Sequence, residues 1–209
     1  MANYRAAKSG LARDSQIKID NAFNVDEARK CLQWIAIMID EDLPIEDTED
    51  KITMRDCFYK ILKDGIVLCR LINVLLPDDR RIDFSKKSFQ PTNMPAFVAA
   101  RERERIGIFL SKVDEYGVPN SASFQTDYLY ERTNLVQVCT CIRSLGIEAQ
   151  SRPDYNGPYV WPKKSEENRR TFTEEQLQAG QQVISLQYGT NKGASQTGMS
   201  FGKSRKIID

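Results

Sequence analysis

Residues 62–75, LKDGIVLCRLINVL, carry the pattern that decides the fold. Leu68, Leu71, Ile72 and Leu75 recur at the spacing i, i+3, i+4 and i+7, which places all of them on one face of a helix. Such an apolar face is stable only when it is buried against other apolar faces. The stretch therefore predicts a helix in the core of a helical domain.

The same spacing recurs three more times along the chain. The sets are Leu32, Ile35, Ala36 and Ile39; Ile106, Phe109, Leu110 and Val113, extended to Tyr116; and Leu135, Val138, Cys139 and Ile142, extended to Leu145. Trp34, among the apolar residues of the first set, is expected in the core because a buried aromatic ring removes a large apolar area from water. Four amphipathic helices predict an all-α class, a compact helical bundle over residues 25–147 that folds alone.

Proline and glycine residues mark the expected ends of these helices. Pro44, Pro77, the segment 117–119 and Gly146 each follow a periodic run, where a helix is expected to stop. Residues 1–24 then form an N-terminal extension, which lacks the apolar core and cleavage site of a secretory signal. We therefore expect a cytoplasmic protein.

The chain after residue 147 is predicted to contain a linker and a tail. The linker, residues 148–180, includes a short helix that begins at the capping box of Thr173 and Gln176 and stops at Gly180. Trp161 in this linker is expected to pin it back on the domain, with contact to a partner as the alternative. Residues 181–206 form the glycine-rich, locally basic part of a tail that we expect to be extended and flexible.

Several patterns argue against an enzyme. The 209 residues include no histidine, so the most common zinc ligand and the usual general base near neutral pH are absent. The segment 193–200, GASQTGMS, matches a phosphate-binding loop except that Met199 stands in place of the lysine. We predict no catalytic residue, no metal and no cofactor, and we expect no nucleic-acid or membrane partner.

The cysteines and the charge runs are expected to have structural rather than functional roles. The five cysteines are an odd number within apolar stretches, which favours buried free thiols. The acidic run DEDLPIEDTED, residues 40–50, places Pro44 and Ile45 where a calcium-binding loop needs an oxygen ligand and a glycine, so a solvated loop is expected. The run RERER, residues 101–105, predicts an exposed salt-bridged helix face, with a docking surface as the alternative.

Three stretches resemble one known family. Residues 62–73, LKDGIVLCRLIN, resemble the central helix of a calponin-homology domain, and residues 127–138, DYLYERTNLVQV, with their continuation to Leu145, resemble its last long helix. Residues 183–205, with LQYGTNKGASQ at 186–196, resemble the calponin-like repeat. One such domain, a short helix and one repeat are together similar to the transgelin and muscle-protein-20 group of the calponin family, and the resemblance covers almost the whole chain.

The resemblance implies a calponin-homology fold and a protein that binds actin filaments, stabilises or bundles them, and modulates contractility on the actin cytoskeleton or muscle thin filaments. The filament contacts would come from the repeat, at Ile184, Leu186, Tyr188, Lys192, Met199, Lys203, Arg205 and Lys206. Ser204 stands between Lys203 and Arg205, a setting that favours phosphorylation, and Ser195 and Ser185 are the next candidates. The alternative is a signalling adaptor whose helical domain docks a kinase or other regulatory protein.

Overall fold

The computed structural model describes residues 9–165 and 169–182, and all regular elements within these ranges are helices. The predicted all-α class is therefore confirmed, whereas the predicted flexible tail lies outside the described residues. The chain divides into two compact units, residues 1–164 and 165–209.

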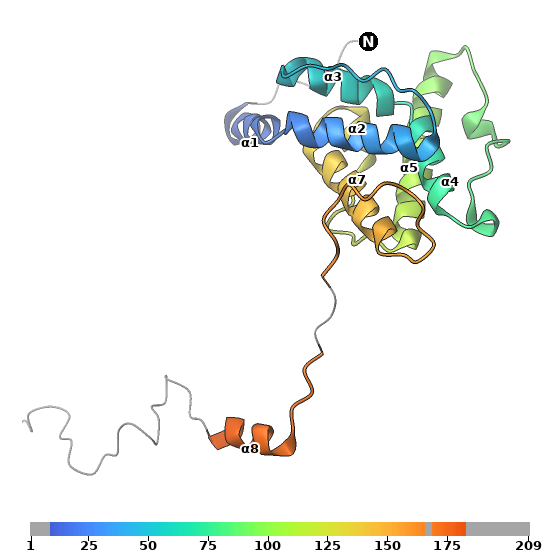
Figure 1. Ribbon diagram of the computed structural model, residues 1–209. Coiled ribbons are helices and arrows are strands. Elements are labelled where there is room, and N and C mark those ends of the chain that lie inside the picture. Colours follow the sequence, from blue (N-terminus) through green and yellow to red (C-terminus); the bar gives the residue numbers. More distant parts are fainter. Residues whose placement is uncertain (1–8, 166–168, 183–209) are drawn as a thin grey trace, which may run out of the picture. The chain divides into compact units, whose positions relative to one another are not determined.

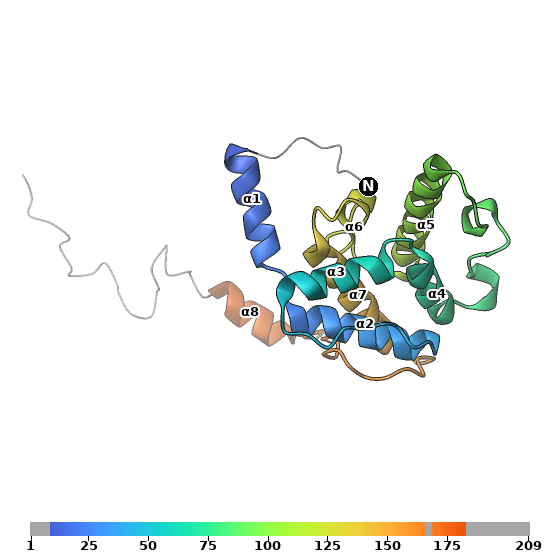
Figure 2. The same ribbon diagram turned by 90° about the horizontal axis from the view of Figure 1, so that it is seen from above.

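The first unit contains seven α-helices and two short 3-10 helices among the described residues. The α-helices are α1 (Gly10–Asn21), α2 (Val25–Ile39), α3 (Lys51–Leu62), α4 (Ile66–Leu75), α5 (Pro95–Tyr116), α6 (Thr126–Tyr130) and α7 (Leu135–Gln150), and the 3-10 helices are η1 (Asp78–Arg80) and η2 (Lys87–Phe89). Helix α2 packs against α3, α4 and α7, and α4 packs against α5 (Figures 1 and 2). The helices thus enclose one core.

The four predicted apolar faces belong to α2, α4, α5 and α7, and each of them reaches this core. Trp34 is completely buried, as predicted. The faces also contribute Leu32, Ile35, Leu68, Leu71, Ile72, Ile106, Phe109, Val113, Val138, Ile142 and Leu145, all with no exposed surface. Their outer members, including Leu75 and Leu110, are only half-buried.

This difference in burial predicts unequal costs of truncation. Leu71→Ala is expected to lower the free energy of unfolding by ~2–5 kcal/mol, because it leaves a cavity in a closed core. Leu110→Ala should cost clearly less, since its half-buried site still reaches water. Urea denaturation of both variants measures the difference, and equal losses would contradict the burial seen here.

Residues 127–138, expected within one long helix, are divided between α6, which ends at Tyr130, and α7, which begins at Leu135. Helices α1 and α3 were not predicted, although α3 carries the same signal as the predicted helices. Met54, Cys57, Phe58 and Ile61 follow the spacing i, i+3, i+4 and i+7, and all four are buried. The carboxylate of Asp50 caps this helix by accepting a hydrogen bond of 2.8 Å from the backbone N–H of Thr53. The bundle therefore has a fifth helix in its core.

Most predicted helix ends are confirmed, but Gly146 is not one of them. Helix α4 ends just before Pro77, and α5 ends at Gly117, whose φ of 103° is in the left-handed region. Helix α7 instead continues through Gly146 to Gln150, and the indole ring of Trp161 lies directly against Gly146. This glycine leaves space for a ring rather than ending a helix.

Residues 151–164, here called the strap, fold back over α2 and α7. Trp161 is only 7% exposed, and its ring meets that of Trp34 edge to face at a centroid distance of 6.1 Å. Trp34 Nε1 donates a hydrogen bond of 3.1 Å to the hydroxyl of Tyr155, which donates in turn to the carbonyl of Pro158. The predicted pinning by Trp161 is confirmed, and the first compact unit extends beyond the predicted boundary at 147.

Candidate functional site

The residues predicted to contact filaments all lie in the segment 183–209, outside the described residues. This applies to Ile184, Leu186, Tyr188, Lys192, Met199, Lys203, Arg205 and Lys206, and also to Ser185, Ser195 and Ser204. The described part of the second unit is α8 (Glu174–Gln182) with the residues before it.

Helix α8 begins at the predicted capping box. The hydroxyl of Thr173 accepts a hydrogen bond from Gln176 N at 3.3 Å, and the Gln176 side chain accepts one from Thr173 N at 3.1 Å. Phe172 and Leu177 stand on either side of the box, at the positions of a hydrophobic staple, and both are exposed. The predicted stop at Gly180 is wrong, because the helix continues to Gln182.

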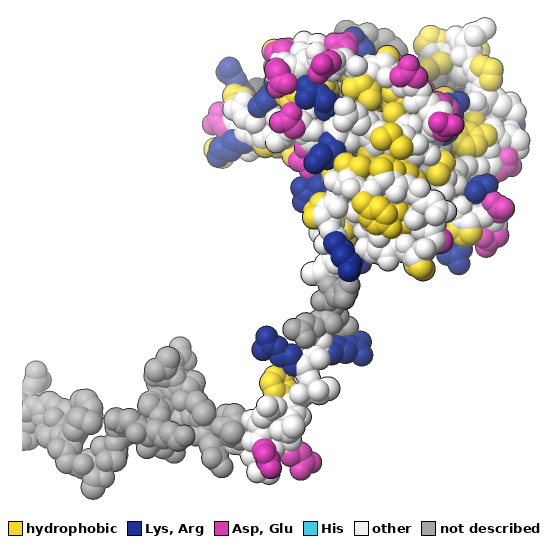
Figure 3. Space-filling model, viewed as in Figure 1, with side chains coloured by type: hydrophobic (Ala, Val, Ile, Leu, Met, Phe, Trp, Pro, Cys, Tyr) yellow, Lys and Arg dark blue, Asp and Glu magenta, His cyan; other side chains and the backbone are white. Residues whose placement is uncertain are grey.

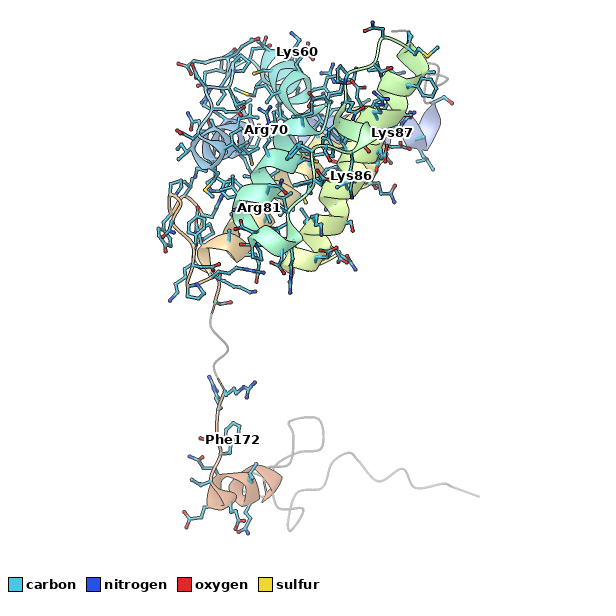
Figure 4. All side chains as sticks on the ribbon, turned by 90° about the vertical axis from the view of Figure 1, so that its right-hand side faces the viewer. Lys60, Arg70, Arg81, Lys86, Lys87 and Phe172 are labelled. Atoms are coloured by element: carbon cyan, nitrogen blue, oxygen red, sulfur yellow. The ribbon has the colours of Figure 1, made fainter. Side chains whose placement is uncertain are left out.

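The domain itself presents a cationic face, formed by Lys60 on α3, Arg70 on α4, and Arg81, Lys86 and Lys87 in the segment between α4 and α5 (Figure 4). Arg70 forms a salt bridge of 2.6 Å with Glu41, and Arg81 forms one of 2.6 Å with Asp78. The three lysines are exposed and form no salt bridge within residues 9–165 and 169–182. Their charges therefore remain available to an acidic partner.

The segment that carries Lys86 and Lys87 is anchored at both ends. Ile82 N donates to the side-chain oxygen of Asn73 at 2.7 Å, and the Asn73 amide donates back to Ile82 O at 2.9 Å. At the other end, Arg105 Nη1 donates to Ser88 O at 2.9 Å. Ile82 and Ser88 are buried, so the exposed residues 83–87, here called the presented loop, project between two fixed points.

Arg105 corrects the prediction made for the run 101–105. Arg103 pairs with Glu131 at 3.3 Å, as expected of a salt-bridged face. Arg105 is buried, with 8% of its surface exposed, and also donates to the Asp64 carbonyl at the head of α4. Its guanidinium joins α5, α4 and the presented loop. The signal that could have identified it is its position one residue before Ile106, on the apolar side of the helix.

Acidic side chains gather along the upper edge of the domain in Figure 3, where residues 41–50 pass over α3. These residues form the predicted loop between α2 and α3, and its acidic side chains are exposed. No group of three or more His, Cys, Asp or Glu side chains with metal-binding geometry occurs in the described ranges.

The cysteines are free and buried, as predicted. Burial raises the pKa of the Cys69 and Cys141 thiols to about 12. The pKa of the Cys139 thiol is also raised, chiefly by a hydrogen bond with the Cys31 thiol and, to a smaller extent, by burial. A protonated thiol is a poor nucleophile, so these three cysteines serve packing rather than chemistry.

A groove of about 650 Å³ lies between α2, α4 and the strap. Its walls include Ile37, Met38, Val74, Tyr155 and Pro158. Ile37 and Val74 are largely exposed, and Figure 3 shows apolar side chains on the face that carries α2 and the strap. The titratable side chains that line it are those of Asp154 and of two tyrosines, Tyr116 and Tyr155, and its exposed apolar walls suit contact with another surface.

Comparison with known proteins identifies the family. Residues 26–151 match the calponin homology (CH) domain, and residues 184–207 match the calponin family repeat. The chain belongs to the calponin family. Myophilin of Echinococcus granulosus is 38% identical to this calponin-family chain over 201 residues, which are 96% of each chain.

A solved CH domain from Rng2 of Schizosaccharomyces pombe shares 24% identity with this calponin-family chain and has a TM-score of 0.47, covering 78% of this chain and 87% of that one. Calponin-family proteins are non-enzymatic components of the cytoskeleton. All predicted filament contacts and the three candidate phosphorylation sites Ser185, Ser195 and Ser204 fall within the matched repeat. In the described residues no helix is both long and apolar enough for a membrane crossing.

Proposed function

We propose that this protein binds actin filaments through residues 184–206, stabilises or bundles the filaments, and thereby modulates contractility in the cytoplasm or on muscle thin filaments. The observation that carries the proposal is the match of residues 184–207 to the calponin family repeat, in a chain whose residues 26–151 match the CH domain. Co-sedimentation of the purified full chain with actin filaments tests it. A chain that stays in the supernatant at micromolar filament concentrations contradicts the proposal.

The composition of the repeat supports this choice. It carries Lys192, Lys203, Arg205 and Lys206, which favour an acidic surface, and interleaves them with Ile184, Leu186, Tyr188 and Met199. Exposed charge pairs contribute only ~0–1 kcal/mol each and are screened beyond ~8 Å at physiological salt. Apolar contacts must therefore supply much of the affinity.

This division of roles predicts different salt responses for charge variants and apolar variants of the repeat. Changing Lys203, Arg205 and Lys206 to Gln is expected to weaken filament binding about tenfold, if each pair contributes ~0.5 kcal/mol, and to flatten its salt dependence. Leu186→Ala should weaken binding while the salt dependence stays. Co-sedimentation between low and high salt measures both effects.

A matched control variant removes three positive charges from the domain instead of from the tail. Changing Lys60, Lys86 and Lys87 to Gln lowers the net charge equally but alters only the cationic face of the domain. This variant should bind filaments like the intact chain. An equal loss in the control and the tail variant would move the filament contact to the domain.

The second candidate function is an adaptor whose CH domain docks a regulatory protein, such as a kinase. The cationic face favours it, because three exposed lysines without salt bridges in the described structure can meet an acidic partner. Under this alternative the control variant, rather than the tail variant, loses binding to its partner.

A further inference from the structure

The presented loop, residues 83–87, has the geometry of a segment offered to another protein. All five of its residues, DFSKK, are exposed, whereas Ile82 and Ser88 at its two ends are buried. Asn73 holds the first end through two hydrogen bonds, and Arg105 holds the second. Ser85 stands at the centre of this loop, between two fixed anchors.

Basic residues flank Ser85 on both sides. Arg80 and Arg81 precede it and Lys86 and Lys87 follow it, and all four side chains are exposed. Kinases select substrates by such charge patterns and need the acceptor serine in an accessible segment. We propose that Ser85 is a phosphorylation site for a serine/threonine kinase that recognises basic residues. This site lies in the domain, and the proposal does not depend on filament binding.

The reaction is a phosphoryl transfer from ATP. The Ser85 hydroxyl oxygen forms a bond to the γ-phosphorus of ATP, while the bond from that phosphorus to the leaving oxygen of ADP breaks. The hydroxyl proton passes to a carboxylate of the kinase. The protein needs only to present the serine, and the kinase with its ATP supplies the remaining groups.

Tertiary structure separates Ser85 from its neighbour Ser88. By sequence, Ser88 is at least as good a candidate, because Lys86 and Lys87 directly precede it. In the fold, only 5% of Ser88 is exposed, and its carbonyl is bound by the buried Arg105. A kinase cannot reach Ser88 without breaking this anchor, whereas Ser85 is accessible as it stands.

A phosphate on Ser85 would change the loop and the cationic face. The Ser85 hydroxyl and backbone N–H both hydrogen bond to the Asp83 carboxylate, and these bonds lower the pKa of Asp83. Phosphorylation removes the hydroxyl donor and places about −1.5 to −2 charges beside that carboxylate. The same charge offsets those of Lys86 and Lys87, so the modified face would attract acidic partners less.

The test compares the folded chain with a short peptide. The full-length protein and a peptide of residues 78–92 are each incubated with ATP and the catalytic domain of a protein kinase C, and the sites are mapped by mass spectrometry. The folded chain should be modified at Ser85 and not at Ser88, while the peptide, which lacks the Arg105 anchor, should be modified at Ser88 as well. A folded chain that is unmodified at Ser85, or modified equally at Ser88, overturns the proposal.

Two further variants sharpen this test. Replacing Ser185, Ser195 and Ser204 by Ala removes the three candidate phosphorylation sites of the tail and should leave the modification of Ser85 unchanged. Changing Lys86 and Lys87 to Gln should lower kcat/KM at Ser85 about tenfold, if each charge contributes ~0.7 kcal/mol, and Lys60→Gln, on the same face but outside the loop, should not. If Ser85 were phosphorylated just as efficiently in the variant that lacks Lys86 and Lys87, the kinase would not be recognising these basic residues, and this part of the proposal would be contradicted.

Discussion

Ending the chain after Gln182 is expected to weaken its binding to actin filaments by well over tenfold and to leave the helical domain folded. The cut removes the matched repeat and all eight predicted contacts. Burial of even one or two of the four apolar side chains at a filament surface would contribute ~1.5–3 kcal/mol each, and every 1.4 kcal/mol is a factor of ten. Co-sedimentation of the intact and shortened chains measures the loss.

The control for this truncation is the stability of the domain. Its core residues, from Phe23 to Trp161, all lie within the compact unit of residues 1–164. The shortened chain should therefore unfold at the same urea concentration as the intact one. If it remains folded and pellets with filaments as well as the intact chain, the CH domain carries the filament site, and the cationic face becomes the first place to look.

Gly146→Ala is expected to destabilise the domain by ~3 kcal/mol, close to the ~3–5 kcal/mol of a buried Trp→Ala change. A methyl group at this position would lie less than 3.0 Å from Nε1 of Trp161, so either the ring or α7 has to move. The ring cannot move alone, because Gln150 fixes the strap: its side-chain oxygen accepts from Val160 N and Trp161 N, each at 2.9 Å. Urea denaturation followed by tryptophan fluorescence measures the loss.

A double variant distinguishes this clash from any other effect of the substitution. Once Trp161→Ala has removed the ring, adding Gly146→Ala should cost nothing further and can restore up to ~1 kcal/mol, since alanine favours helix more than glycine does. Gly107→Ala in α5 is the matched control, because a methyl group there meets nothing within 4 Å. It should stabilise the domain slightly. Similar effects of Gly107→Ala and Gly146→Ala would disprove the contact with Trp161.

One part of the candidate site, the tail contacts, can be located from local sequence. The other part, the cationic face, is brought together only by the fold. The tail contacts lie within 23 consecutive residues, so a sequence motif is enough to locate them. The cationic face combines Lys60, Arg70 and Lys86 from three separate segments, and no local pattern predicts that they share a surface. The difference in access between Ser85 and Ser88 likewise depends on Arg105, which is 17 residues beyond Ser88.

The sequence by itself determined the helical class. Apolar residues recur with the 3.6-residue period of a helix in four separate stretches, and this spacing can be recognised within each stretch alone. It also determined the helix end at Gly117, where a left-handed residue is required, and the capping box at Thr173. Tertiary structure alone decided that Gly146 stays inside a helix, that Arg105 is buried and which residue the predicted Trp161 contact of the strap packs against. Each of these outcomes depends on partners distant in the chain: Trp161 for Gly146, the Ser88 and Asp64 carbonyls for Arg105, and Trp34 for the strap. A glycine or an arginine has the same local pattern whether or not such a partner exists, and only packing determines which of its possible roles it takes.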